Sequence, residues 1–269
     1  MVLYVLALVS NVAVIALLAE SVAAEFLLCY AVMSSIAGPF VVWYFSSDWA
    51  LALSFRVLWG MLSFVVVIGI ALWILWGVIA TVALLYVVTL LVADYLTNQK
   101  LGIAWVRGYR VFLVATLLVY PLDWLLSEIP VVAVRIVGCV ALVSVAIWKP
   151  GRIEPLKLTN PLSKILILHV LYFGPLAFCS SVVAPSAVKL AFVLQQIGLT
   201  IPLKLIDFQI RRHVRDISLF MAVGYPLSVV CGFASMVVAG NYSVVGVYVV
   251  AAIAMAIIQV LEAKCLRHV

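Results

Sequence analysis

The sequence predicts an all-α, polytopic transmembrane bundle of about ten helices with both termini in the cytoplasm. Hydrophobic residues make up 68% of the chain and charged residues 10%, whereas a soluble domain has roughly 45–50% apolar and about 25% charged residues. The apolar excess must therefore face lipid. Unpaired backbone amides are costly in hydrocarbon, so only helices or a closed barrel can span it. Stretches such as Val65–Ala80 are apolar on every face, without the alternation of a barrel strand.

Ten apolar segments follow when the chain is cut wherever charges or turn residues cluster, because a spanning helix needs roughly 20 residues. The predicted segments are Val2–Ala19, Ala24–Phe45, Ala52–Ile70, Trp73–Leu96, Ala104–Tyr120, Val131–Trp148, Ile165–Val183, Ser186–Leu203, Ile217–Val238 and Ser243–Leu261. The division near Ala71 has no polar turn, so eight crossings with one long tilted helix stay open. The first segment lacks the basic start of a signal peptide and is expected to remain uncleaved, with cleavage after Ala24 as the alternative.

The distribution of Lys and Arg sets the predicted orientation, because these residues gather in cytoplasmic loops. With the N-terminus inside, fourteen of the 16 bases fall in inner loops or at inner helix ends. They are Arg56, Lys100, Arg107, Arg110, Lys149, Arg152, Lys157, Lys164, Lys204, Arg211, Arg212, Arg215, Lys264 and Arg267. The acidic residues Glu20, Glu25, Asp123 and Glu128 fall outside. We therefore expect a multi-pass protein of the cytoplasmic (inner) membrane.

One long connection divides the predicted bundle into two lobes. Residues 149–164 contain three prolines, a glycine and four bases, which exclude a membrane-embedded helix. They predict a cytoplasmic linker between a six-helix lobe, residues 1–148, and a four-helix lobe, residues 165–269. A second basic stretch, Lys204–Asp216, has apolar residues among its charges and is expected to continue the eighth helix along the interface.

The patterns of membrane enzymes are missing from the sequence. It has no paired aspartates on one helix face, no H-E-x-x-H and no G-x-S-x-G, and its five cysteines form no C-x-x-C pair. We therefore expect no enzymatic activity, no metal and no cofactor. The net charge of +6 is explained by topology, so nucleic acid is not an expected partner. His169 lies within a helix, where it is either a side chain packed near the inner interface or an intramembrane catalytic or proton-relay group.

Two bases fall outside the inner loops and inner helix ends. Arg135 and Lys189 lie near the outer ends of the sixth and eighth helices. One interpretation is that both side chains snorkel to the outer headgroups. The other is that both face a shared water-filled cavity and bind an anionic substrate, joined by Gln196 on nearly the same helix face as Lys189.

Helix-breaking pairs occur in two of the predicted helices. Gly38 and Pro39 lie in the second, and Gly174 and Pro175 in the seventh. Proline removes a backbone donor and bends a helix, as in many transporters that alternate between two open states. The four residues are therefore predicted to form helix kinks.

Three features resemble the oligosaccharide and polysaccharide flippases of the multidrug/oligosaccharidyl-lipid/polysaccharide superfamily, which share the MATE-like fold. The first is Leu18-Ala-Glu-Ser-Val-Ala-Ala-Glu25, similar to the acidic turn between that family's first two helices. The second is Tyr172-Phe-Gly-Pro-Leu-Ala177, similar to the opening of its second lobe. The third is the longest linker after the sixth helix. The resemblance implies a flippase that moves a lipid-linked or anionic saccharide across the membrane in polysaccharide biosynthesis, with membrane lipids around it.

The predicted helix number departs from that family, which normally has twelve or more helices. Two alternatives therefore stay open. A ten-helix drug/metabolite-type carrier with two inverted five-helix halves explains the number and places the glycine-proline pairs in equivalent helices. A non-catalytic membrane subunit of a polysaccharide-synthesis complex is the third class.

Overall fold

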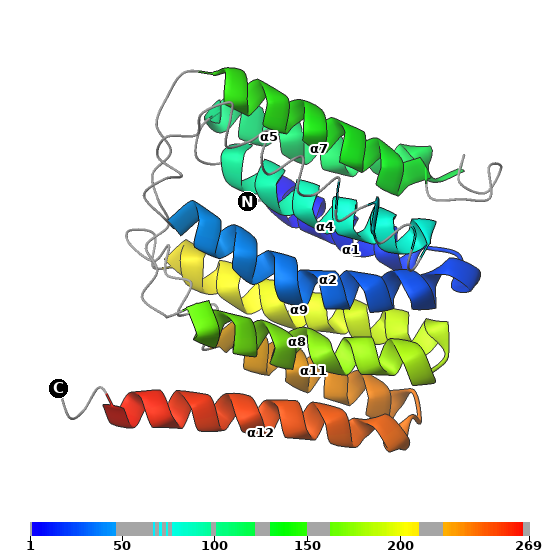
Figure 1. Cartoon of the computed structure of the whole chain (residues 1–269), viewed down its shortest axis with the longest axis vertical. Coiled ribbons are helices and arrows are strands. Elements are labelled where there is room, and N and C mark those ends of the chain that lie inside the picture. Colours follow the sequence, from blue (N-terminus) through cyan, green and yellow to red (C-terminus); the bar gives the residue numbers. More distant parts are fainter. Residues whose placement is uncertain are drawn as a thin grey trace. The chain divides into compact units, whose positions relative to one another are not determined.

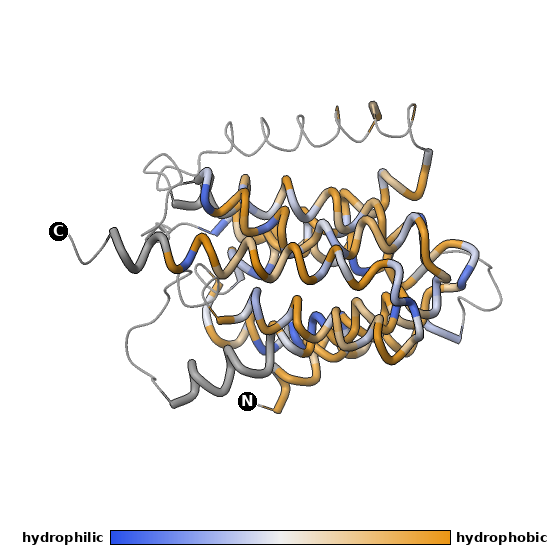
Figure 2. The backbone as a smooth tube through the Cα atoms, turned by 90° about the horizontal axis from the view of Figure 1, so that it is seen from below, coloured by the Kyte–Doolittle hydropathy of each residue, from blue (hydrophilic) through white to orange (hydrophobic). Residues whose placement is uncertain are grey.

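A computed structural model of the chain describes residues 2–46, 77–97, 101–121, 130–149, 162–209 and 223–265, with positions 67, 70, 71 and 74. All regular elements in these residues are helical, which confirms the predicted all-α class (Figure 1). Five helices in this part of the chain are long and apolar enough to cross a membrane. They cover Glu20–Val41, Val78–Leu96, Val131–Trp148, Ser163–Val182 and Tyr242–Val260. This indicates a multi-pass membrane protein, and the apolar residues are spread along all of the helices (Figure 2).

The helices follow the predicted segments closely. Those before the long linker are α1 (Val2–Ala16), α2 (Glu20–Ser46), α4 (Val78–Leu96), α5 (Ile103–Ala115), the 3₁₀ turn η3 (Thr116–Val119) and α7 (Pro130–Trp148). Those after it are α8 (Leu162–Val182), α9 (Pro185–Gln209), α11 (Tyr225–Val238) and α12 (Tyr242–Cys265). The predicted continuation of the eighth helix beyond Leu203 is confirmed as far as Gln209. The predicted third segment, except for positions 67 and 70, and the first part of the ninth lie outside the described residues.

Several predicted boundaries differ from the structure, among them the start of the seventh helix, which lies at Leu162 inside the predicted linker rather than at Ile165. Two of the differences have a local cause. The second helix begins at Glu20 rather than Ala24, because an acidic side chain in the first turn interacts favourably with the helix dipole. The break before α4 falls at Gly77 rather than near Ala71, which is itself helical. Gly77 has φ 86° and ψ −174°, a conformation outside the helical region that glycine tolerates best. A single continuous helix through this point is therefore excluded.

Contacts within the chain define two compact units, which we describe separately. Unit 1 comprises Met1–Val22 and Phe40–Leu156, and unit 2 comprises Ala23–Pro39 and Lys157–Val269. Helix α2 is divided after Val22 and again after Pro39, so its central part belongs to unit 2 and its two ends to unit 1. Most of residues 149–164 lie outside the described part, so the cytoplasmic linker and the division into six and four helices stay predictions.

In unit 1, α1 packs against α5, and α4 packs against α7 (Figure 1). Small side chains allow these helices to approach closely, among them Ala93 and Ala146, which are both 0% exposed. Pro130 is the first residue of α7. A backbone N–H at that position has no acceptor within the helix, so proline, which has no N–H, is well tolerated there. The result is an apolar core that also includes Tyr109 and Leu113.

In unit 2, α11 packs against α8, α9 and α12. The part of α2 in this unit contacts α8 and α9 through Tyr30. The Tyr30 ring packs edge-on against the rings of Phe173 and Phe192, at centroid distances of 6.2 and 5.5 Å. Pro39 and Pro175 both lie inside helices that continue past them. The glycine-proline pairs therefore do not end helices, and their predicted kinks stay predictions.

Candidate functional site

Arg135 lies at the centre of a polar cluster in unit 1. Its residue is 0% exposed, so the side chain does not reach the surface as a snorkelling arginine would. The guanidinium donates from Nε to the Thr116 hydroxyl at 2.8 Å, and from one terminal nitrogen to Asn11 Oδ1 at 2.7 Å and the Tyr86 hydroxyl at 3.2 Å. The other terminal nitrogen donates to the hydroxyl and carbonyl oxygens of Ser10, and to the Leu113 carbonyl at 2.7 Å.

These partners come from different parts of unit 1. Ser10 and Asn11 lie on α1, Tyr86 on α4, Leu113 on α5 and Thr116 on η3. The Ser10 and Thr116 hydroxyls both also donate to the Leu113 carbonyl, each at 2.6 Å. The cluster therefore joins every described helix that lies wholly within unit 1.

All the acceptors around Arg135 are neutral. They are hydroxyl, amide and backbone oxygens, and none is a carboxylate. A guanidinium keeps its charge in proteins and has five N–H donors. The cluster satisfies those donors geometrically but supplies no opposite charge, so a buried positive charge stays uncompensated in this part of the structure.

Lys189 and Gln196 both lie on α9 in unit 2, apart from Arg135 in unit 1. Lys189 is half-buried and is the fifth residue of the helix. Gln196 is also half-buried and donates from Nε2 to the Tyr172 hydroxyl at 3.1 Å. The structure thus joins Gln196 to α8. The cavity predicted to be shared by Arg135 and Lys189 stays a prediction, because the two residues belong to separate units.

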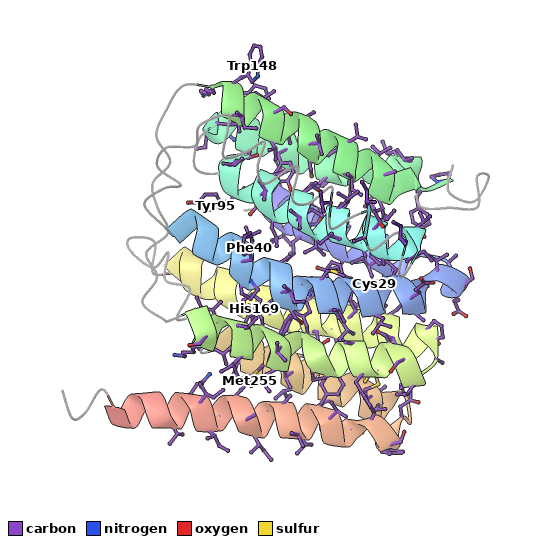
Figure 3. The ribbon with its side chains drawn as sticks, in the orientation of Figure 1. Cys29, Phe40, Tyr95, Trp148, His169 and Met255 are labelled. Carbon is purple, nitrogen blue, oxygen red and sulfur yellow. The ribbon has the colours of Figure 1, made fainter. Side chains whose placement is uncertain are left out.

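A second polar cluster surrounds His169 in unit 2. The residue is 6% exposed and lies on α8, facing Gly38 of α2 (Figure 3). Its Nδ1 lies 2.9 Å from the Ile165 carbonyl, and its Nε2 lies 3.0 Å from the Tyr225 hydroxyl on α11. Tyr225 stacks on Tyr172 with a centroid distance of 4.8 Å and an interplanar angle of 15°. Hydrogen bonds and ring contacts thus connect His169 to Gln196.

Two buried polar atoms beside this cluster lack a conventional hydrogen-bond partner in the described part of the chain. They are Gln195 Nε2 and the Tyr248 hydroxyl. Gln195 is 1% exposed, and its backbone carbonyl accepts a hydrogen bond from the Ser228 hydroxyl. Gln195 is thus the glutamine turned toward α11, whereas the predicted site residue Gln196 bonds to α8.

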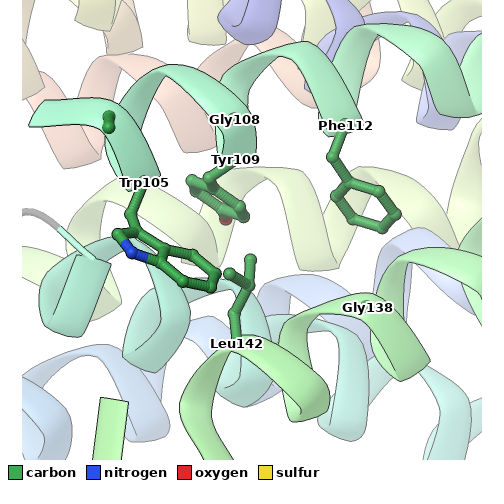
Figure 4. Close-up of a pocket in the computed structure, with 7 residues that line it drawn as sticks. Trp105, Gly108, Tyr109, Phe112, Gly138 and Leu142 are labelled. Atoms are coloured by element: carbon green, nitrogen blue, oxygen red, sulfur yellow. The ribbon is translucent and has the colours of Figure 1, made fainter. Parts of the chain in front are cut away.

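An apolar pocket of about 380 Å³ lies between α5 and α7 in unit 1 (Figure 4). Its lining residues are Ala104, Trp105, Gly108, Tyr109, Phe112, Gly138 and Leu142. None of these side chains is charged, so the pocket suits hydrocarbon rather than an anion. No predicted site residue lines it.

Sequence reasoning identified Arg135 but not its partners. Each partner is a polar residue in an otherwise apolar helix, and Ser10-Asn11 is the one polar pair in α1. That pair could have predicted a polar contact with another helix, since polar side chains within spanning segments usually bond to groups on neighbouring helices. The described residues contain no group of three or more His, Cys, Asp or Glu that could hold a metal ion.

Comparison of the chain with protein-family models, with curated proteins and with solved structures found no match.

Proposed function

We propose that this protein is a multi-pass membrane transporter for an anionic substrate, acting as a flippase for a lipid-linked saccharide. The observation that carries the proposal is the fully buried Arg135, whose partners among the described residues are all neutral. An ionisable side chain within a membrane-spanning segment is costly and usually has a functional role. The flippase class comes from the sequence resemblance, and the buried charge supports the anionic substrate.

An anion would supply the opposite charge that the cluster lacks. A phosphate or diphosphate offers several oxygens to the guanidinium fork, and charge-assisted hydrogen bonds of this kind are roughly twice as strong as neutral ones. It would replace weaker neutral acceptors such as Asn11 Oδ1 and the Tyr86 hydroxyl. Because those acceptors sit on different helices, their release would loosen α1 and α4 from α7 while the substrate is bound. Ligand binding and helix movement would then be linked, as alternating access requires.

Transport by the purified protein in liposomes tests this proposal. An NBD-labelled short-chain polyprenyl-diphosphoryl sugar serves as the probe, and dithionite quenching reports its movement between leaflets. We expect the wild type to move the probe and Arg135→Met to raise its half-saturating concentration about 10- to 100-fold, since a charged hydrogen bond contributes about 1.5–3 kcal/mol. Arg107→Met is the matched control, because it removes the same charge from an exposed position on α5. Equal probe movement by both variants would contradict the role of Arg135.

The drug/metabolite-type carrier is the second candidate, and one contact favours it. Helices α2 and α8 each contain a glycine-proline pair, and they meet inside unit 2 where His169 lies against Gly38. Two inverted five-helix halves would place these helices in equivalent positions. A radiolabelled hexose phosphate distinguishes the two classes, since the carrier moves it and the flippase does not. If neither probe is moved, the chain is better explained as a non-catalytic subunit of a larger complex.

A further inference from the structure

We propose that His169 is the proton-binding site through which a proton gradient drives transport, an inference that rests on the proposed function. Three observations carry it: the buried imidazole, its hydrogen bond to Tyr225, and its contact with α2 next to Pro39, a proline inside that helix. The ligand of this site is a proton that arrives from water and binds the Nε2 lone pair of the imidazole, which accepts from Tyr225 in the neutral state.

The hydrogen bonds define where that proton binds. The Ile165 carbonyl can only accept, so the neutral ring carries its hydrogen on Nδ1 and donates at 2.9 Å. Nε2 is then an acceptor, and the Tyr225 hydroxyl donates to it at 3.0 Å. A proton that binds Nε2 reverses this bond: Nε2–H becomes the donor, the Tyr225 oxygen the acceptor, and the hydroxyl hydrogen must turn to another group. Proton binding therefore changes the link between α8 and α11.

The described neighbours of His169 offer no negative charge to the protonated ring. The described titratable or charged side chains on the helices of unit 2 other than α8 are Glu25, Cys29 and Tyr30 on α2, Lys189 on α9, Tyr225 and Cys231 on α11, and Tyr242 and Tyr248 on α12. Within α8 they are Lys164, Tyr172 and Cys179. Of these groups, only Tyr225 makes a polar contact with the imidazole in the described structure. A charged imidazolium in this setting is unfavourable until water or an anion reaches it.

The contact with α2 provides the mechanical connection. An ideal Cβ on Gly38 would lie 3.0 Å from His169 Cδ2 and 3.1 Å from Nε2, so the ring packs directly against the α2 backbone. The next residue, Pro39, cannot donate to the carbonyl one turn earlier, which weakens the helix at this point. Protonation would thus favour a state in which α2 and α8 separate and the ring is hydrated. A proton that binds one of two conformations more tightly shifts the balance between them, and transport can be coupled to that shift.

Transport under an imposed pH gradient tests the coupling. Wild-type protein in liposomes is given the polyprenyl-diphosphoryl sugar probe with and without a gradient, and trapped pyranine reports proton movement. We expect the gradient to accelerate probe movement about fivefold or more in the wild type, within the range of ordinary coupling between two sites. His169→Gln keeps a polar side chain but should lose both the acceleration and the pyranine signal. Acceleration that survives in His169→Gln overturns the proposal.

A glycine pair supplies a test of the α2 contact. Gly38→Ala should displace the His169 ring and reduce the acceleration, whereas Gly174→Ala, whose new Cβ would meet nothing within 4 Å, should leave it unchanged. Equal behaviour of the two variants contradicts the mechanical part of the proposal. Both substitutions replace glycine by alanine inside a helix, so general effects on helix stability are matched.

A measurement without substrate separates the two proposals. Nitrogen NMR of ¹⁵N-histidine-labelled protein, with the signal assigned by His169→Gln, reports the protonation of the ring directly. We expect a neutral ring with hydrogen on Nδ1 that protonates reversibly as the medium is acidified. If neither probe is transported but His169 titrates, the proposed function fails and the proton site stands. If the signal stays neutral until the protein unfolds, the proton site is wrong whatever the transport result.

Discussion

Replacing Arg135 by methionine should destabilise the protein less than replacing it by lysine, although lysine keeps the charge. Methionine removes a buried charge that has no carboxylate partner in the part of the chain that the structure describes. The Ser10 and Thr116 hydroxyls keep their own hydrogen bonds to the Leu113 carbonyl at 2.6 Å. The Asn11 amide oxygen and the Tyr86 hydroxyl each lose the hydrogen bond that the guanidinium donates to them.

The expected magnitude follows from these losses. Each buried polar group that loses its partner costs about 1–3 kcal/mol, and removal of the uncompensated charge offsets much of that sum. We expect Arg135→Met to lower the free energy of unfolding by about 0–3 kcal/mol, less than the about 3–5 kcal/mol for breaking a buried ion pair. Lysine has three donors where the guanidinium has five, and its ammonium is more strongly hydrated. The free energy of unfolding of Arg135→Lys should therefore be lower than that of Arg135→Met by about 1 kcal/mol or more.

Unfolding in detergent micelles measures this order. The fraction of folded protein is followed by circular dichroism as sodium dodecyl sulfate is added, and Arg107→Met serves as the exposed control, with an expected change within about 0.5 kcal/mol. A lysine variant as stable as the wild type, together with a loss above about 5 kcal/mol in the methionine variant, would refute the reasoning. That result would mean that the charge itself stabilises the fold through a negative partner.

Two further predictions concern packing and topology. Gly232→Ala should destabilise unit 2 by about 1–3 kcal/mol relative to Gly246→Ala in the same unfolding assay, because overpacking a buried site costs that much. The new Cβ would lie 2.3 Å from Tyr248 Cε1 at the first position and meet nothing within 4 Å at the second, so equal stability of the two variants would argue against this packing. Single cysteines introduced within residues 149–164 should react with impermeant maleimides from the cytoplasmic side, and labelling from the outer side would show that the predicted orientation is wrong.

The helices could be read from the sequence because a bilayer imposes one simple requirement, a run of apolar residues long enough to cross it. That rule located α7 and α12 to within one residue at their N-termini. It failed at Glu20, where an acidic residue was taken as a turn but suits the first turn of a helix. It also failed at Gly77, since glycine gives no contrast in hydropathy although its backbone conformation there lies outside the helical region.

The same reasoning predicted only part of the site. Arg135 stood out because a base inside an apolar helix is rare, but Asn11 lies 124 positions away in the chain and Tyr86 lies 49 away. No local pattern encodes such pairings. His169 likewise has two interpretations on sequence alone, and its contacts with Gly38 and Tyr225 appear only in the structure.

The sequence by itself determined that this is an all-α, multi-pass membrane protein. It has so many apolar and so few charged side chains that most of them must face lipid, where the backbone has to be helical. Only the tertiary structure decided which polar groups meet. In hydrocarbon a buried donor must find an acceptor, and the acceptor that it finds depends on which helices pack together rather than on the order of residues in the chain. The neutral environment of Arg135 and the contact between His169 and Tyr225 both follow from that packing.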